Sequence, residues 1–358
     1  MNDQEIQITP NRPEPIELIQ EPDKVIKKSD HVIAAKSLLK GTNLLVADRY
    51  STGMAILAEL KKQVFRGKKK SDFTAYRDSR SRFYRASNHL LVPIKGNKIS
   101  LKKAPEPGWL EKLYPDKDDF HLTFPQFQGL NSSWQWYLNG IKYPGLKEKI
   151  HPYYGTYFPT RFDHLQLFDN WLKKYSSPKT SAIDIGTGCG VLAFQMLNHG
   201  FETIYTSDIN PNALISVAEH ARTHDLENRI HLMLSDLFET HTQKSDLVVF
   251  NPPWLPAEKD IEGLDNAIYY EPGLFDRFFE QAGDYMNEMG RLVLLFSNLA
   301  ESAGLSDLHP VKKELTEQQR FKKIRLLKRK VKQSSKKTKR RDHRKNEFVE
   351  LWELEKIF

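Results

Sequence analysis

The chain has 358 residues, of which 39% are hydrophobic and 28% charged, so it is long enough to bury a full core and to form more than one domain. The one cysteine, Cys189, excludes an internal disulfide framework and a zinc site built on several thiolates, and it fits a reducing cytoplasm. The first residues carry no signal-peptide pattern, and no run of about 18 apolar residues occurs. We therefore expect a cytoplasmic protein that does not span a membrane.

The net charge of +8 is unevenly distributed along the chain. Residues 320–345 contain fifteen Lys and Arg against one acid, a net of +14, and residues 61–88 contain ten against two, a net of +8. The remainder is therefore acidic, with a net of −14. Two basic stretches in an otherwise acidic chain favour a polyanionic partner that binds at these two stretches.

Residues 1–28 are rich in Pro, Glu and Asp and show little apolar periodicity, so we expect a flexible lead-in there. Residues 29–130 are predicted to form a mostly helical N-terminal targeting domain. Its helical periodicity occurs at 31–40, with Asp30 as the cap, at 54–60 and at 72–88. LLVPI and KISL then predict a hairpin, and four prolines make 102–130 a connector with at most short helices.

Residues 131–160 are predicted to contain a second hairpin, formed by WQWYL and IKYP around Asn139-Gly140, and an access motif before the main domain. From residue 161 to 358, apolar strands such as SAIDI and DLVVF alternate with amphipathic helices. This alternation indicates an α/β domain with a doubly wound parallel sheet that is covered on both faces. KKIRLLKRKV and EFVELWEL are expected to end the domain as an antiparallel pair, joined by the basic loop 332–346.

A glycine turn follows the first of these strands, with Asp184, Gly186, Gly188 and Gly190 in the run DIGTGCG. Glycines let the backbone turn sharply and approach a ligand at the carboxyl edge of the sheet. The spacing G-x-G-x-G differs from the dinucleotide pattern G-x-G-x-x-G, and no phosphate-binding GxxxxGK[ST] occurs. The acid before the first glycine is unsuited to a diphosphate but suits an ammonium group.

The turn resembles the first motif of the class I S-adenosylmethionine-dependent methyltransferases. The resemblance implies a seven-stranded Rossmann-like sheet with an antiparallel last strand, S-adenosylmethionine as cofactor and S-adenosylhomocysteine as product. It also implies that Asp208 in TSDIN binds the ribose hydroxyls and that Asp236 in SDLF binds the adenine amino group. The cofactor-binding residues expected are Asp184, Gly186, Thr187, Gly188, Gly190, Asp208, Ile209, Asp236, Leu237 and Asn251. The structural alternative is that the glycines only form a tight turn. Each acid would then be a solvated turn residue or a helix cap.

The strand DLVVF ends in Asn251-Pro252-Pro253-Trp254. One interpretation is structural, because consecutive prolines end a strand. The other is chemical: an amide or aryl amine nitrogen is a poor nucleophile, and the Asn251 oxygen and the Pro252 carbonyl would accept its N–H groups and aim its lone pair at a methyl group. Trp254 would stack on the planar group. The tetrapeptide matches the (N/D)PP(Y/F/W) motif of methyltransferases that act on planar nitrogens, so its four residues are the predicted catalytic residues.

Upstream of the fold, YFPTR resembles the Pro-Arg element that closes over cofactor and target in release-factor glutamine methyltransferases. The resemblance implies that Thr160 and Arg161 lie at the access to the substrate. The alternatives are a helix cap for Thr160 and a surface ion pair for Arg161. The resemblance covers about residues 135–300 and the final LWEL. The chain is also similar to small-domain rRNA methyltransferases and, over more of its length, to an uncharacterised group of bacterial methyltransferases.

The basic stretches predict nucleic-acid contacts, because arginines between aromatic residues suit phosphate contact and base stacking. The candidates are Arg77, Arg80 and Arg85 in the helix 72–88, and Lys336, Lys337, Lys339, Arg340 and Arg341 in the basic loop. The alternatives are a solvated helix face and a tail that only aids solubility. His231, His241 and His343 show no ligand spacing, so no metal site is expected.

The combined prediction is a monomeric enzyme that transfers a methyl group from S-adenosylmethionine to a planar nitrogen. The first hypothesis for the acceptor is an exocyclic amine of an rRNA or tRNA base. The second is a glutamine amide in a translation factor or ribosomal protein. The third is a catalytically silent cofactor-binding adaptor for RNA or the ribosome. The expected partners are RNA or a ribosome-associated protein, without a membrane or a metal.

Overall fold

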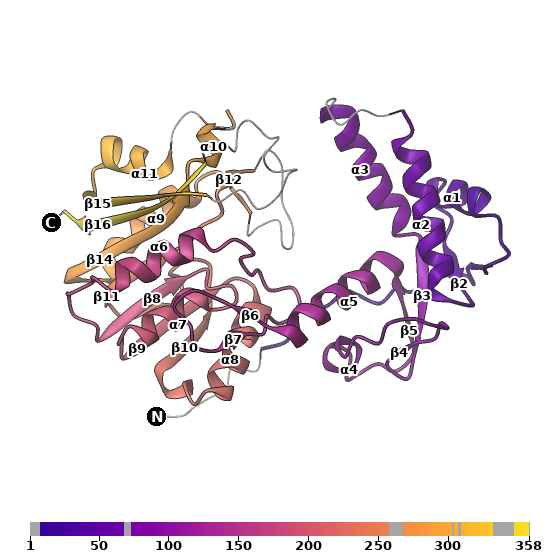
Figure 1. Ribbon diagram of the computed structural model, residues 1–358, viewed down its shortest axis with the longest axis horizontal. Coiled ribbons are helices and arrows are strands. Elements are labelled where there is room, and N and C mark those ends of the chain that lie inside the picture. Colours follow the sequence, from indigo (N-terminus) through magenta and orange to yellow (C-terminus); the bar gives the residue numbers. More distant parts are fainter. Residues whose placement is uncertain are drawn as a thin grey trace. The chain divides into compact units, whose positions relative to one another are not determined.

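The computed structural model describes residues 8–67, 73–257, 268–302, 304–306, 309–331 and 347–357. The chain divides into two compact units (Figure 1). The small unit is Arg12–Leu138, and the large unit combines Met1–Asn11 with Asn139–Phe358. Each unit has its own main sheet.

The small unit contains a five-stranded sheet. In chain order the strands are β1 (Asp23–Val25), β2 (Leu44–Val46), β3 (Leu90–Lys95), β4 (Lys98–Ile99) and β5 (Phe120–Thr123). β1, β2 and β3 are parallel neighbours, and β4 and β5 pair antiparallel with β3. The predicted LLVPI hairpin is therefore present, as β3 and β4. The sheet was not predicted, and β1 lies in the expected lead-in, because strands of three residues are too short to show period-two alternation.

The helices of the small unit are α1 (His31–Leu39), α2 (Tyr50–Phe65), α3 (Phe73–Ser87), α4 (Trp109–Leu113) and α5 (Phe124–Asn139). Three of them lie close to where periodicity predicts them, α1, α2 and α3, whereas the long helix α5 begins inside the stretch 102–130 that was predicted to be a connector with at most short helices. The Asp30 carboxylate accepts the backbone N–H groups of Val32 and Ile33, which confirms the predicted cap of α1. A Cβ on Gly53 would lie 2.0 Å from the Phe124 ring, so the first turn of α2 accommodates α5 only with glycine there.

The hairpin predicted around Asn139-Gly140 is wrong on its first arm, because WQWYL belongs to α5. Phe124, Phe127 and Leu130 are buried along this helix, and their burial determines the conformation of the residues that follow. Gly140 has φ +61° directly after the helix, so Asn-Gly acts here as a helix end instead of a hairpin turn. The pair that follows is short, β6 (Ile141–Lys142) with β7 (Lys149–Ile150).

The large unit is built on a seven-stranded sheet with the order β10-β9-β8-β11-β14-β16-β15 (Figure 1). Its strands are β8 (Ser181–Ile185), β9 (Thr203–Asp208), β10 (Ile230–Leu234), β11 (Ser245–Phe250), β14 (Met286–Ser297), β15 (Phe321–Lys330) and β16 (Phe348–Lys356). The strands from β10 to β14 are parallel, and β16 runs antiparallel to both β14 and β15. The predicted doubly wound α/β sheet with an antiparallel last strand is therefore confirmed.

Helices cover both faces of this sheet. They are α6 (Asp163–Leu172), α7 (Val191–Asn198), α8 (Pro211–Thr223), α9 (Leu274–Ala282), α10 (Leu299–Ser302) and α11 (Pro310–Lys313). Alternate strand residues belong to two cores: Val249 and Leu351 pack in the core that holds α6, α7 and α8, and Val248 packs in the core that holds α9. The remaining short elements are β12 (Leu255–Pro256), β13 (Tyr269–Tyr270), the 3₁₀ turns Glu227–Arg229 and Gly283–Tyr285 and a π-helical turn, Glu314–Gln318. None of the described helices is both long and apolar enough to cross a membrane.

β15 carries much of the basic stretch 320–345, and β16 supplies acids to it. Three pairs stand directly opposite each other in the register, at 2.6 Å for Lys322–Glu355, 3.6 Å for Arg325–Glu353 and 2.8 Å for Lys328–Glu350. Cross-strand pairs of opposite charge stabilise an antiparallel ladder. Part of the positive charge that the sequence suggested for a ligand is therefore neutralised within the sheet.

Glu350 is the most enclosed of these acids, with 1% of its surface exposed. Its Oε2 accepts the indole N–H of Trp352 at 2.9 Å, and His309 Nε2 lies 3.2 Å from the same oxygen. Burial opposes its ionisation, but the contacts with His309 and Lys328 outweigh burial and lower the pKa of Glu350 to about 2.

The low pKa of Glu350 predicts an acid-sensitive contribution to folding. This contribution is complete above the unfolded-state pKa of 4.5 and is lost as the pH falls toward the folded value of about 2. Between pH 5 and pH 2 the wild type should lose up to about 3 kcal/mol of unfolding free energy that Glu350→Gln does not lose. Urea unfolding across this range measures the difference, with Glu106→Gln at an exposed position as the matched control. Parallel stability curves for the wild type and Glu350→Gln would contradict the prediction.

Candidate functional site

The predicted site residues of the large unit converge at one edge of its sheet. β8, β9 and β11 are parallel, and in the register Ile185 lies beside Ser207 on one side and Phe250 on the other. The residues that follow these strands therefore leave the sheet at its carboxyl edge, where ligands of open α/β sheets bind. The glycine turn, Asp208 and Asn251 are thus brought together by topology.

The glycine turn requires glycine at its centre and at its end. Gly188 has φ +53°, and a Cβ there would lie 3.0 Å from the carbonyl oxygen of Tyr157. Gly190 has φ +81°, and a Cβ there would lie 2.7 Å from the Phe194 ring. A side chain at either position would be strained and would displace a neighbour. The two glycines therefore let the turn pack closely against the Tyr157 carbonyl and the Phe194 ring.

Asp184 lies beneath this turn with 0% of its surface exposed. The Thr187 hydroxyl donates to its Oδ2 at 2.7 Å, whereas its Oδ1 is buried and has no hydrogen-bond partner among the described residues. Burial raises the pKa of Asp184 to about 7, the Thr187 hydrogen bond opposes this, and the charge of Asp208 adds to it. A buried carboxylate with one unpaired oxygen fits a cofactor that carries an ammonium group.

Asp208 is joined to the same turn. Its Oδ2 accepts the backbone N–H of Gly188 at 2.9 Å, and its Oδ1 accepts the backbone N–H of Asn210 at 2.9 Å. Burial raises its pKa, although these backbone donors favour the carboxylate. The next residue, Ile209, exposes 57% of its surface and offers the kind of apolar cover that a planar ring can use. The roles predicted for both residues in cofactor binding stay predictions.

Asp236 and Leu237 follow β10 and differ from each other in environment. Asp236 Oδ2 lies 2.7 Å from Nη1 of Arg277 on α9, and both side chains are partly exposed, at 39% and 45%. Leu237 is buried and has φ +50°. Arg277 therefore holds one oxygen of the acid, and the predicted contact of Asp236 with an adenine amino group stays a prediction.

The NPPW tetrapeptide emerges from β11 with one unpaired acceptor. The Asn251 Oδ1 is buried and has no hydrogen-bond partner among the described residues, and Pro252 is buried. Trp254 is half-buried, packs against both cores and lies with its indole Nε1 3.3 Å from the Leu295 carbonyl, to which it donates. Pro253 is also half-buried. Trp254 is thus anchored to β14, and its predicted stacking on a substrate stays a prediction.

His164 contacts this tetrapeptide and was not singled out in the sequence. Only 3% of its surface is exposed, and its ring meets the Trp254 ring edge to face, with centroids 5.2 Å apart. Neither ring nitrogen has a hydrogen-bond partner among the described residues. Burial lowers the pKa of His164 to about 4, so the imidazole is neutral near pH 7. A single histidine in an amphipathic helix gives no sequence signal for such a contact.

The segment before α6 lies against the glycine turn through its backbone. The Cys189 N–H donates to the Tyr157 carbonyl at 3.1 Å, and the Asn210 side-chain amide donates to the Gly155 carbonyl at 2.9 Å. The Thr156 hydroxyl donates to the Asn212 carbonyl at 2.9 Å. Sequence reasoning missed Tyr157, because a residue that acts through its carbonyl oxygen leaves no signature in its side chain.

The structure gives Thr160 and Arg161 different surroundings. Thr160 is exposed and does not cap α6, whose N-cap residue is Phe162. Arg161 Nη1 lies 3.4 Å from both carboxylate oxygens of Glu347, which is itself 3% exposed. Glu347 accepts the N–H of Val331 through its carbonyl and so joins the two ends of the basic loop. The structure therefore agrees with the ion-pair alternative for Arg161.

The predicted nucleic-acid contacts fall partly on α3 of the small unit and partly on residues outside the described part of the chain. Arg80 and Arg85 are exposed on α3 of the small unit. The side chain of Arg77 lies outside the described residues, as do Lys336, Lys337, Lys339, Arg340 and Arg341. Among the described residues no group of three or more His, Cys, Asp and Glu could hold a metal ion.

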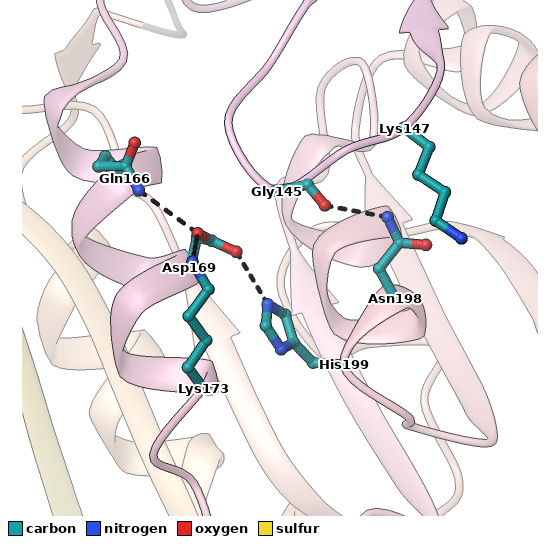
Figure 2. A pocket seen from close by; sticks show the side chains of 7 residues that line it. All are labelled: Gly145, Lys147, Gln166, Asp169, Lys173, Asn198 and His199. Atoms are coloured by element: carbon teal, nitrogen blue, oxygen red, sulfur yellow. Dashed lines mark hydrogen bonds and ion pairs between the residues drawn. The ribbon is translucent and has the colours of Figure 1, made fainter.

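A surface pocket of about 470 Å³ lies between α6 and α7, and none of the predicted site residues lines it (Figure 2). Its buried acid, Asp169, lies 2.8 Å from Nε2 of His199 and 2.7 Å from Nζ of Lys173. The Asn198 amide donates to the Gly145 carbonyl at 3.0 Å. Because these polar groups are already paired, we interpret the pocket as a structural junction between the two helices.

The part of the chain that matches a known protein family lies in the large unit. The family model described as "Methyltransferase small domain" matches residues 164–325. A provisionally assigned protein N5-glutamine methyltransferase of Methanocaldococcus jannaschii is 30% identical over 179 residues, which are 48% of this chain and 86% of that protein.

Two further relatives are named for glutamine methylation. The release factor glutamine methyltransferase of Streptococcus pneumoniae is 32% identical over 126 residues, 32% of this chain and 44% of the relative. The ribosomal protein uL3 glutamine methyltransferase of Francisella tularensis is 31% identical over 145 residues, 37% of this chain and 45% of the relative. The chain thus spans less than half the length of these two relatives.

The raised pKa of Asp184 predicts pH-dependent binding of a cofactor that carries an ammonium group. Because the carboxylate form is the better partner, affinity for S-adenosylhomocysteine should fall as the pH drops below about 7, by at most about tenfold per pH unit. Titration calorimetry between pH 6 and 8 measures this. Asp184→Asn should bind weakly with little pH dependence, and the exposed Asp225→Asn should behave as the wild type. A pH-independent affinity in the wild type would contradict the assignment.

The environment of His164 predicts that its ring shape matters more than its nitrogens. His164→Ala should cost about 2–3 kcal/mol of unfolding free energy, because it opens a cavity beside Trp254. His164→Phe should stay within about 1 kcal/mol of the wild type, because it fills the site and removes a buried unpaired polar group. Guanidinium unfolding measures both variants. A Phe variant as unstable as the Ala variant would mean that a nitrogen makes an essential contact.

Proposed function

Because the chain belongs to the S-adenosylmethionine-dependent methyltransferases with the small methyltransferase domain, we propose that it methylates the side-chain amide nitrogen of a glutamine in a protein. The protein is a methyltransferase, and S-adenosylmethionine is its cofactor. The identity of the substrate is what we propose. A substrate in the translation apparatus would place the protein in the cytoplasm, as expected from its sequence.

The observation that carries the proposed methylation of a planar nitrogen is the unpaired Asn251 Oδ1 at the carboxyl end of β11. A primary amide presents two N–H donors, and the Asn251 oxygen and the Pro252 carbonyl would accept them. An unpaired acceptor in a low-dielectric site interacts strongly with a donor that arrives with the substrate. Because Pro252 follows directly and has a fixed φ, the acceptor pair is held before the substrate binds.

The chemistry required of these residues is orientation and stabilisation of charge. When bound, the cofactor supplies a methyl group on a sulfonium sulfur. Asn251 and Pro252 would hold the amide so that its nitrogen faces this methyl group, and their oxygens would stabilise the positive charge that develops on the nitrogen. A new N–C bond forms as the S–C bond breaks, and the nitrogen releases one proton to water.

The acceptor differs from the first hypothesis drawn from the sequence. An exocyclic amine of an RNA base would use the same two acceptors, so the tetrapeptide alone does not separate it from glutamine. The names of all three relatives specify glutamine as the methylated residue. Two of the names also specify the protein, a release factor in one case and ribosomal protein uL3 in the other. This agreement supports the amide over the base amine, and an RNA acceptor becomes an outcome of the test.

The proposal predicts that Asn251→Ala loses methyl transfer and keeps cofactor binding. Removing one preorganised acceptor should lower kcat by about 100-fold or more, while the dissociation constant for S-adenosylhomocysteine should stay within about threefold. Radiolabelled methyl transfer to a lysate from a deletion strain measures the first quantity, and calorimetry measures the second. Asn170→Ala, at an exposed position on α6, is the matched control.

The labelled fraction identifies the acceptor. The proposal expects label that survives RNase and is lost with protease, on a peptide whose glutamine carries the added mass of one methylene group. Label that is lost with RNase would assign an RNA base instead. Undiminished transfer by Asn251→Ala would remove the mechanism whichever acceptor is found.

A further inference from the structure

The outer face of α3 in the small unit carries an aromatic residue that packing does not explain. Phe83 faces inward, and its ring centroid lies 6.4 Å from that of Phe65 on α2. Its neighbour Tyr84 exposes 67% of its surface. Ser79 and Ala86 are buried, so the orientation of the helix is fixed by its inner side. Folding therefore accounts for Phe83 but not for Tyr84.

Three exposed arginines occur close to Tyr84 in α3, with Arg80 on its side of the helix and Arg82 on the opposite side. Arg80 precedes it by four residues and so lies one helical turn away on the same side, and Arg85 follows it directly. Arg82 is exposed as well. Within the part of the chain that the structure describes, none of these three cations has an ion pair. Only one acid occurs in the α3 sequence, Asp78.

We propose that this face of α3 binds a single-stranded segment of RNA. Each guanidinium can hold a phosphate through paired hydrogen bonds, and an exposed tyrosine ring between such cations offers a stacking surface for an unpaired base. An acidic polypeptide would form ion pairs with the arginines alone, and the exposed ring would then have no role. The pairing of ring and cations therefore favours a nucleic acid over a protein partner.

The choice of RNA over DNA rests on the proposed function, because release factors and ribosomal proteins meet their partners on ribosomes. The small unit would then bring the enzyme to a glutamine that is presented beside RNA. Phosphate contacts add affinity without sequence preference, and this affinity falls as the salt concentration rises. Binding by α3 is thus separable from methyl transfer at the carboxyl edge of the large unit.

The test uses the full-length protein and a fluorescent oligo(U), with oligo(dT) and polyglutamate as competitors. Arg80→Ala/Arg82→Ala/Arg85→Ala should weaken oligo(U) binding by about tenfold or more and lower the salt slope by about 2, for three lost phosphate contacts. Tyr84→Ala should weaken binding by about fivefold or more, whereas Tyr84→Phe should keep wild-type affinity because the ring remains. Lys28→Ala/Lys36→Ala/Lys40→Ala removes three exposed cations from the same unit as the matched control.

The outcomes separate this inference from the proposed function. All variants should keep wild-type circular dichroism and methylate an isolated glutamine peptide at the wild-type rate. Equal oligo(U) binding by the triple arginine variant and the control would overturn the inference, as would wild-type affinity in Tyr84→Ala. Competition by polyglutamate as strong as that by unlabelled oligo(U) would assign the face to an acidic protein. Tighter binding of oligo(dT) than of oligo(U) would overturn the assignment to RNA.

Discussion

One backbone hydrogen bond, from the Cys189 N–H to the Tyr157 carbonyl, defines how the functional edge of the large unit is assembled. It brings the segment before α6 against the glycine turn, and the approach is close enough that Gly188 has no room for a Cβ. The same turn donates a backbone N–H to Asp208 and lies above Asp184. Loss of this contact would separate the access segment from the turn, whereas Asp184 and Asp208 would stay in place as residues of the paired strands β8 and β9.

The edge also shows how a protein can keep polar groups ready for a ligand. Asp184 Oδ1 and Asn251 Oδ1 are both buried without a hydrogen-bond partner among the described residues. Each unpaired group costs folding free energy, so the surrounding fold has to hold it in place. Apolar strands such as β11, buried along its whole length, supply that rigidity. A ligand that supplied the missing donors would recover this cost.

Long strands and the residues that end them could be predicted, because five apolar segments alternate with amphipathic helices and their ends meet at one edge. This reasoning located Asp184, Asp208 and Asn251. It failed where signals were short or ambiguous: β1 and β2 have three residues each, and Asn139-Gly140 ends a helix as readily as it turns a hairpin. Tyr157 and His164 were missed because one acts through its carbonyl and the other through its ring contact with Trp254.

Net charge was the least reliable of the sequence signals, because it does not record which cations have partners. On β15, Lys322, Arg325 and Lys328 each face an acid of β16, and at its end Arg329 lies 3.3 Å from Asp163. These cations stabilise the antiparallel end of the sheet, and charged side chains on an edge strand also discourage pairing with another chain. Among the described residues, the exposed Arg80, Arg82 and Arg85 of α3 have no ion pair. The number of cations in a stretch therefore matters less for ligand binding than the absence of acids opposite them.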